Sequence, residues 1–244
     1  MKLGYGLMKS NNPAISVRVA NMKLRFKGSN LRIKYNEKER LYSINDANKT
    51  YYFGNLVRGY GLYGKGLKRR AEVLYNSYLL NNIEFSQDDC VIDCGANYGD
   101  LYLNLSDEIR EDNYFCIEPS PSEFECLKLS LPKASIRQIG LAAKTGHMEF
   151  YVSSETADSS VIQPKKYESI IKIKVITLDE FAKQAGISRC KLFKLEAEGY
   201  EYEILLGGKN FLKNCEYITV DGGAERGHSD EPTLPEISNF LFHM

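Results

Sequence analysis

Residues 90–99 read Cys-Val-Ile-Asp-Cys-Gly-Ala-Asn-Tyr-Gly, an apolar run that leads directly into a turn with two glycines. The run predicts a buried strand over 90–94, and the glycines predict a loop at the carboxyl end of that strand. In an open α/β sheet, ligands bind beyond the carboxyl ends of the strands. We therefore expect the loop over 95–99 to form part of a ligand site.

Strand-like runs alternate with helix-like segments from residue 88 onward, which is typical of a parallel sheet covered by helices on both faces. Strands are expected at 90–94, 114–118, 135–139, 191–195 and 217–221. Helices are expected near 99–109, 121–130, 178–185, 200–212 and 233–242. Runs at 148–152 and 171–177 predict an inserted antiparallel pair, with a polar loop between its strands. The fold class is therefore α/β.

Charge divides the chain near residue 70. Residues 1–70 hold 16 Lys and Arg against 3 Asp and Glu, a net charge of +13, and residues 71–244 hold 16 against 29, a net charge of −13. Such asymmetry indicates two parts with different roles. The basic part suits an acidic substrate, an anionic membrane surface or nucleic acid, and packing on the acidic part of its own chain explains it equally well. We place the boundary between a substrate-side region over 1–66 and a main domain over 67–244.

The basic region has its own pattern. Short alternating runs broken by polar turns predict two small antiparallel β-hairpins over 22–53. The glycine-rich stretch over 54–66 is expected to be a loop, and apolar residues at helical spacing predict an amphipathic helix over 67–82.

Composition limits the class of protein. The chain has 244 residues, of which 43% are hydrophobic and 26% charged, as in a soluble globular protein. No segment has the roughly 20 apolar residues of a membrane-spanning helix, and the first 20 residues lack an apolar run of signal-peptide length. We expect a cytoplasmic protein with no integral membrane segment and no metal site. Its cysteines, at positions 90, 94, 116, 126, 190 and 215, are expected to be reduced.

Two acidic residues stand at the ends of neighbouring strands. Asp93 ends the first, and Glu118, followed by Pro119, ends the second. A carboxylate in the second position can accept hydrogen bonds from both hydroxyls of a ribose, and one before the loop suits a cation better than a diphosphate. We expect both to point into one pocket that binds a cationic nucleoside such as S-adenosylmethionine. The third glycine of dinucleotide-binding loops is missing, which disfavours an NAD-dependent enzyme.

Three segments, VIDCGANYGDLYLNL (91–105), FCIEPSPSEFECLKLSL (115–131) and LFKLEAEGYEYEILLGG (192–208), resemble the FkbM family of S-adenosylmethionine-dependent methyltransferases. The resemblance covers about residues 70–230. It implies a Rossmann-like class I methyltransferase fold, S-adenosylmethionine as cofactor, and commonly O-methylation of sugars or other hydroxylated compounds. The cofactor-binding residues it implies are Asp93, Gly95, Ala96, Asn97, Tyr98, Gly99, Glu118, Pro119 and Leu141.

The third segment supplies candidates for catalysis. Glu196 stands where the family usually has Asp, at the end of the fourth strand. We expect Glu196 to face the methyl acceptor and Glu198 to support the turn beside the acceptor. A positioned base helps to deprotonate a weakly acidic hydroxyl, and the candidates are Glu196, Asp221 after the fifth strand, and His228 in the following loop.

The N-terminal part and the helix over 67–82 are expected to cover the pocket mouth. Aromatic faces suit sugar rings, and arginines suit carboxylate or phosphate groups. An acidic glycan, a nucleotide-sugar or a lipid-linked saccharide is therefore the expected acceptor. The residues expected to contact it, besides Glu198, are Tyr60, Tyr63, Lys68, Arg69 and Arg70.

Class I sheets normally end with two further strands, and here only one helix-like segment follows 217–221. We expect that final pair to be missing. The fifth strand would then be an exposed edge unless something covers it. We expect the inserted pair, or a second copy of the chain in a homo-oligomer, to do so.

Two other functions compete with this interpretation. A nucleic-acid methyltransferase would use the basic part to bind phosphates, but its usual Asn/Asp-Pro-Pro-aromatic motif is replaced by LEAEGYE at 195–201. We therefore expect no nucleic-acid partner. A non-enzymatic binding module on a degenerate sheet is the other possibility, and the intact set of Asp93, Gly95, Gly99 and Glu118 argues against it.

Overall fold

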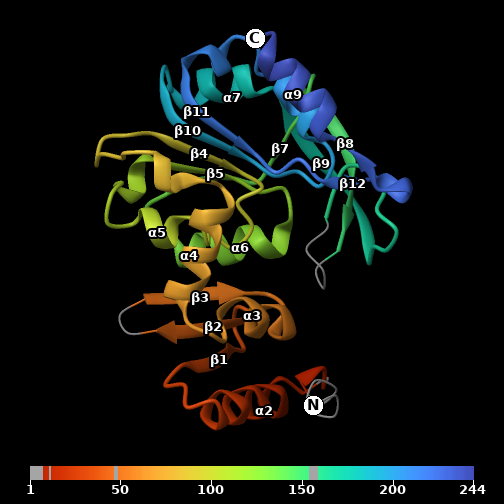
Figure 1. Cartoon of the computed structure of the whole chain (residues 1–244). Helices are drawn as coiled ribbons and strands as arrows, with labels where there is room; N and C mark the ends of the chain where they lie inside the picture. The colour runs from red at the N-terminus through yellow and green to blue at the C-terminus, as the bar shows by residue number, and fades with distance from the viewer. Residues whose placement is uncertain (1–7, 11, 47–48, 154–158) are drawn as a thin grey trace.

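A five-stranded parallel sheet forms the centre of the protein (Figure 1). The computed structural model describes residues 8–10, 12–46, 49–153 and 159–244. The strands lie in the order β11-β10-β4-β5-β6. Their bounds are β4 Val91–Cys94, β5 Tyr114–Ile117, β6 Ser135–Arg137, β10 Cys190–Leu195 and β11 Cys215–Val220. All five expected strands are confirmed, and the strand order reverses between β4 and β10, where ligands bind in such sheets.

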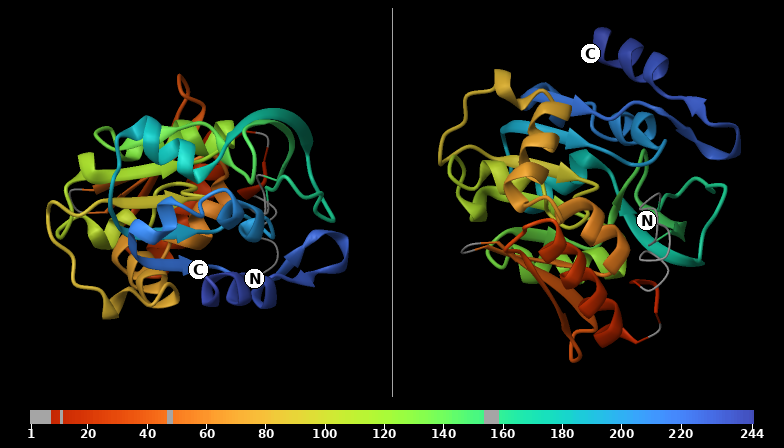
Figure 2. Two further views of the ribbon diagram at one scale, coloured as in Figure 1. Left: turned by 90° about the horizontal axis from the view of Figure 1, so that it is seen from above. Right: turned by 60° about the horizontal axis from the view of Figure 1, so that its bottom comes forward.

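Helices cover both faces of this sheet, as expected for a Rossmann-like fold (Figures 1 and 2). One face carries α4 Leu67–Ser77, α5 Tyr102–Leu105 and α6 Pro121–Ser130, and the other carries α7 Leu178–Ala185, α8 Glu201–Leu206 and α9 Leu234–Phe242. The helices expected over 99–109 and 200–212 are shorter than predicted. Helix α8 ends where Gly207 and Gly208 pack tightly, since a Cβ at Gly208 would lie 2.7 Å from Leu178.

The inserted strands form a second, small sheet. Strands β8 Gly146–Val152 and β9 Ser169–Ile176 are antiparallel, as expected, and β9 also pairs with β7 Gly140–Leu141. Part of the polar loop between β8 and β9, residues 154–158, lies outside the described residues. The expectation that these strands cover the edge of β11 is wrong, because they pair only with each other and with β7. Strands β12 Ala224–Arg226 and β13 Glu231–Pro232 form a separate hairpin.

The N-terminal region combines helices with an antiparallel sheet. Its elements are α2 Pro13–Phe26, β1 Arg32–Asn36, β2 Leu41–Asp46, β3 Lys49–Phe53 and α3 Leu56–Tyr63. The expected pair of hairpins is wrong at its beginning, because residues 22–26 belong to α2. The side chain of Asn12 caps this helix by accepting from the N–H groups of Ala14 and Ile15, and Pro13 occupies the first turn.

The loop expected over 54–66 is largely helix α3. Asn55 caps it by accepting from the N–H of Arg58 at 3.0 Å. Gly59 faces the ring of Phe53, and a Cβ there would lie 2.1 Å from the ring. The glycine is therefore explained by the packing of α3 on β3 rather than by a loop.

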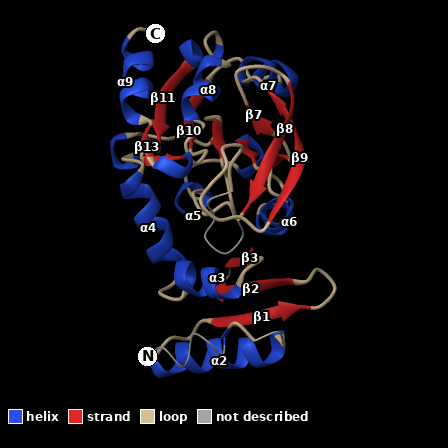
Figure 3. Cartoon of the chain, turned by 90° about the vertical axis from the view of Figure 1, so that its right-hand side faces the viewer, coloured by secondary structure: helices blue, strands red, loops and turns tan. Residues whose placement is uncertain are grey.

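The hydrophobic core on the α4–α6 side is continuous with the core of the N-terminal sheet. One cluster of buried side chains includes Leu24 and Ile33 as well as Leu103 and Leu127. The N–H of Tyr52 in β3 donates to Ser130 at the end of α6 (3.1 Å). Figures 1 and 3 show α2 at the outer end of this arrangement, beyond β1. No helix in the described part of the chain is long and apolar enough to cross a bilayer.

Candidate active site

The loop after β4 is fixed by two neighbouring strands. Gly95 has φ +72°, and a Cβ there would lie 2.0 Å from the carbonyl oxygen of Glu196. The N–H groups of Gly95 and Ala96 both donate to the carbonyl of Ile117 (3.0 and 3.2 Å). The close approach of β10 thus explains why position 95 is glycine. Gly99 serves packing instead, because a Cβ there would lie 2.8 Å from Leu131.

A cavity, which we call the Glu118 cavity, opens beside this loop. Its empty space is about 710 Å³, including solvent at its mouth. Its apolar lining comes from Ile117, Leu141, Phe150 and Ile173, and Pro119 also lines it. A cavity lined by both apolar side chains and carboxylates suits a flat base attached to a polar sugar.

Glu118 is the buried acid of this cavity, with 6% of its surface exposed. Its two carboxylate oxygens accept from the N–H groups of Asn97 and Ser120, both at 2.9 Å. Burial and the charge of Glu123 raise the pKa of Glu118 to about 7, although the two backbone hydrogen bonds lower it. Each carboxylate oxygen keeps a further lone pair that can accept a hydroxyl hydrogen.

Asp93 points away from the Glu118 cavity, so the expected common pocket is wrong. Side chains alternate along a strand, and Asp93 shares the face of Val91, which looks toward α4. Its carboxylate accepts from the hydroxyl of Tyr114 at 2.5 Å and lies 3.1 Å from Nζ of Lys194. Asp93 therefore belongs to the wall of a second cavity.

The second cavity, which we call the Lys194 cavity, lies between the ends of β4, β10 and β11 and helix α4. Its empty space is about 1160 Å³, including open solvent. Ala96 also lines the Lys194 cavity. The Lys194 cavity adjoins the Glu118 cavity, because four residues line both: Gly95, Asn97, Glu196 and Glu198. The side chains that give it its charge are Arg58, Arg70, Asp93, Asp100, Lys194, Glu196, Glu198 and Asp221.

Lys194 is the centre of this cavity's charge network. Its ammonium lies 3.1 Å from Asp93 and 3.0 Å from Glu196, and it donates to the carbonyl of Gly95 at 2.8 Å. Burial lowers the pKa of Lys194, but the charges of the two carboxylates raise it by more, so the net shift is upward and the group stays protonated. The sequence interpretation missed this residue. Its one signal was a lysine near the carboxyl end of a largely apolar strand, at the position that pairs with Asp93.

Glu196 faces the Lys194 cavity and is held there. Its carboxylate accepts from the hydroxyl of Tyr78 at 2.6 Å. Burial raises the pKa of Glu196, but the charge of Lys194 and the hydrogen bonds from Tyr78 and Lys194 lower it by more, so the net shift is downward. Glu196 is consequently a carboxylate at neutral pH and a weak base.

Asp221 also lines the Lys194 cavity, at the end of β11. Burial and the charge of Glu196 raise the pKa of Asp221, partly offset by Lys194. Two of the three candidate bases, Glu196 and Asp221, thus share one cavity. His228 is exposed in the loop between β12 and β13 and lines neither cavity, so the structure does not bring it to them.

The turn after β10 is supported by Glu201. Glu201 accepts from the N–H groups of Ala197 and Gly199, at 2.7 and 3.2 Å. Glu198 has φ +50° within that turn and lines both cavities. Glu201 was missed because its only sequence signal is an acidic residue in the first turn of a helix.

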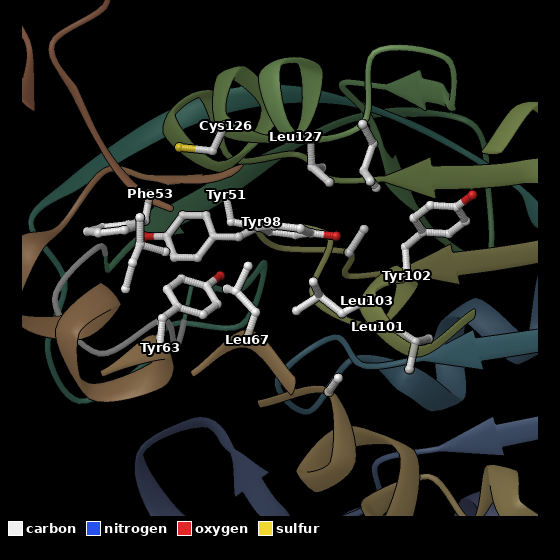
Figure 4. Packing of buried hydrophobic residues seen from close by; sticks show 14 of the residues in the cluster. Tyr51, Phe53, Tyr63, Leu67, Tyr98, Leu101, Tyr102, Leu103, Cys126 and Leu127 are labelled. Atoms are coloured by element: carbon white, nitrogen blue, oxygen red, sulfur yellow. The ribbon is translucent and has the colours of Figure 1, made fainter. Parts of the chain in front are cut away.

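Three aromatic residues expected at the site lie in the core. Tyr60 and Tyr63 are 4% and 0% exposed, and the hydroxyl of Tyr63 donates to Asp100. Tyr98 is fully buried, with its ring 4.7 Å from the guanidinium carbon of Arg58. Figure 4 shows Tyr63 and Tyr98 among the packed side chains. Tyr60 and Tyr63 lie on the buried face of α3, and Tyr98 packs into the same core from the loop after β4, so the expectation that these three residues contact a ligand is wrong.

The expected basic contacts also separate. Lys68 and Arg69 are exposed and line a different hollow, next to Asp46. Arg70 alone of the three lines the Lys194 cavity, and its Nε lies 2.7 Å from Asp100. The three residues follow one another on α4, so the helical rotation of 100° per residue directs them to different sides.

A Rossmann-like sheet with two adjoining cavities at its switch point has the architecture in which α/β proteins bind their ligands. The model of the methyltransferase FkbM domain matches residues 93–244. The chain therefore belongs to the FkbM methyltransferase family.

Two relatives are similar to parts of the chain. Hexuronic acid methyltransferase AglP of Haloferax volcanii is 28% identical over 142 residues, 57% of this chain and 57% of that protein. The chain thus spans little more than half of that relative's length. 2-O-methyltransferase NoeI of Sinorhizobium fredii is 21% identical over 198 residues, 73% of this chain and 82% of that protein. No solved structure matches the chain.

Proposed function

We propose that this protein is an S-adenosylmethionine-dependent O-methyltransferase whose acceptor is a sugar or another hydroxylated compound. The observation that carries the proposal is Glu118, a buried carboxylate in a largely apolar cavity that adjoins a second cavity whose lining includes Glu196 and Asp221. The name of one relative, a hexuronic acid methyltransferase, supports a sugar acceptor, and the name of the other, a 2-O-methyltransferase, supports transfer to oxygen.

The residues present fit this cofactor. Glu118 can accept the ribose hydroxyls, and the apolar side chains of its cavity suit adenine. Asn97 Oδ1 is buried between the two cavities without a partner among the described residues, so it is available to a ligand donor. The residues that would hold the cofactor are therefore Gly95, Asn97, Glu118, Pro119 and Leu141.

When bound, the cofactor supplies an electrophilic methyl group, and the chain must orient the acceptor hydroxyl and receive its proton. Asp221 is the better base of the two carboxylates, because its pKa is raised and its side chain makes no hydrogen bond or ion pair to another described residue. Glu196, held by Tyr78 and Lys194, orients the acceptor.

The acceptor group that enters the Lys194 cavity is an uncharged hydroxylated ring. Each cation lining this cavity is already paired: Arg58 with Glu123 at 3.3 Å, Arg70 with Asp100, and Lys194 with Asp93 and Glu196. A carboxylate on the acceptor would therefore meet unpaired acidic charge at Asp221. The sequence favours an anionic acceptor instead, and the methylation panel described below distinguishes the two.

We place the reaction in the cytoplasm, since the cysteines are free thiols and four of them are buried. Pairing of a second copy along the open edge of β11 is the homo-oligomer consistent with this sheet.

The test is calorimetry with S-adenosylhomocysteine, followed by transfer of labelled methyl from S-adenosylmethionine to a panel of neutral hexosides and hexuronides. We expect binding by the wild type, weaker binding by Glu118→Gln, and faster methylation of the neutral ring. Absence of cofactor binding would refute the proposed enzyme, and faster methylation of hexuronides would refute the uncharged acceptor alone.

A further inference from the structure

Helix α2 has one face fixed on the N-terminal sheet. Ser16, Ala20 and Leu24 are buried there. The side chain of Asn21 donates to the carbonyl of Ile33 and accepts from its N–H, both at 2.8 Å, which ties the helix to β1. These contacts fix the rotation of α2 about its axis, so its opposite face points away from the protein.

That outer face is apolar. Ile15, Met22 and Phe26 are 46%, 53% and 85% exposed. Half-buried Val19 stands between them. Their spacings of four, three and four residues place these side chains in one stripe along the helix. An amphipathic surface helix should carry polar residues in this position, so the stripe requires an explanation.

Basic side chains flank the stripe. Arg18 and Arg25 are exposed along one side of it, half-buried Lys23 lies on its other side, and Lys27 follows the last turn of the helix. The first 36 residues contain 8 Lys and Arg and no Asp or Glu. The surface around α2 is therefore apolar along its middle and cationic at its sides.

We propose that α2 docks this protein on the surface of an anionic phospholipid bilayer, with Ile15, Val19, Met22 and Phe26 inserted among the headgroups. An apolar stripe between Arg and Lys side chains is the pattern of helices that lie in the membrane interface. The basic side chains attract the anionic headgroups, and the apolar ones gain by leaving water. The helix has 14 residues, which suits lying in the interface rather than spanning it.

Other partners fit less well. Nucleic acid would contact the cations but would leave the exposed Phe26 and Met22 without an apolar partner. A second copy of this chain needs roughly 800 Å² per partner for a stable interface, far more than this short stripe offers. The proposal gives the basic region over 1–66 a role in docking, and it stands independently of the proposed reaction.

The test is flotation of the full-length protein with vesicles of equal parts phosphatidylglycerol and phosphatidylcholine, compared with phosphatidylcholine alone. We expect the wild type to float only with anionic vesicles. The double variant Met22→Asp/Phe26→Asp should lose at least about tenfold in bound fraction. The matched control is Phe242→Asp in α9, because Phe242 is also 85% exposed.

A second variant tests the charge. Arg18→Glu/Arg25→Glu should reduce flotation to the level seen with phosphatidylcholine alone, and added salt should do the same to the wild type. Circular dichroism and S-adenosylhomocysteine binding should remain unchanged in all variants, because α2 lines neither cavity. The proposal is overturned if the wild type does not float with anionic vesicles, or if Phe242→Asp lowers flotation as much as the α2 variants. It is equally overturned if the Met22 and Phe26 substitutions abolish a dimer or duplex binding instead.

Discussion

Cofactor affinity should depend on pH through Glu118. Its carboxyl pKa is raised to about 7, so the group is half protonated near neutrality in the free protein. Only the ionised form accepts hydrogen bonds from both ribose hydroxyls. Binding should therefore strengthen as pH rises through 7 and level off above pH 8.

The size of the effect follows from the titration. With a pKa of about 7, Glu118 is about 90% ionised at pH 8 and about 10% ionised at pH 6. The Kd for S-adenosylhomocysteine should accordingly be about tenfold higher at pH 6, or about 1.4 kcal/mol weaker. Bound cofactor stabilises the carboxylate, so the complex should take up fewer protons than the free protein.

Isothermal titration calorimetry from pH 6 to pH 8 measures this dependence directly. 5′-Methylthioadenosine serves as a second ligand, because it keeps the ribose and lacks the titrating amino group. Glu118→Gln is the matched variant, and its weaker affinity should not vary with pH. A pH-independent Kd in the wild type, or the same slope in Glu118→Gln, would show that Glu118 does not bind the ribose.

Three further perturbations test the site. Asp221→Asn should lower kcat by about 10²–10⁴-fold with unchanged S-adenosylhomocysteine affinity, and a retained rate in steady-state assays would remove Asp221 as the base. Lys194→Met leaves the buried carboxylate of Asp93 without its cation and should cost about 3–5 kcal/mol in urea unfolding, whereas Lys191→Met on the same strand should cost less than about 1 kcal/mol. Gly95→Ala places a Cβ 2.0 Å from a carbonyl oxygen and should abolish cofactor binding. Gly61→Ala is the matched control, because a Cβ there has no atom within 4 Å, and it should stabilise α3 by about 1 kcal/mol. Equal Tm values for the two variants would contradict the packing argument.

The sheet was predictable from the sequence because buried parallel strands must be apolar on both faces. The runs at 90–94 and 191–195 are largely apolar and lie between polar segments, which indicates strands. The N-terminal helices were not predictable in the same way. Five residues such as 22–26 fit both a two-residue and a 3.6-residue period, and α3 depends on the contact of Gly59 with Phe53 from another element.

The site was predictable in part for a related reason. Glu118, Glu196 and Asp221 follow strands, and the carboxyl ends of parallel strands meet at one edge of the sheet. The direction of Asp93 was mistaken, because the alternation within β4 places it on the α4 face. Lys194 was missed for two reasons. Its partner Asp93 is distant in sequence, and its contact with Glu196 can be recognised only once the strand faces are known.

The wall shared by the two cavities couples whatever occupies them. This wall consists of Gly95, Asn97, Glu196 and Glu198. A ligand that displaces it enlarges one cavity and makes the other smaller. Thermodynamic linkage then requires each occupant to change the affinity of the other by the same factor. Substitutions in this wall are consequently expected to change the affinity for both ligands together. Substitutions that change the affinity for one ligand alone are expected on α4 or in the small β7-β9-β8 sheet.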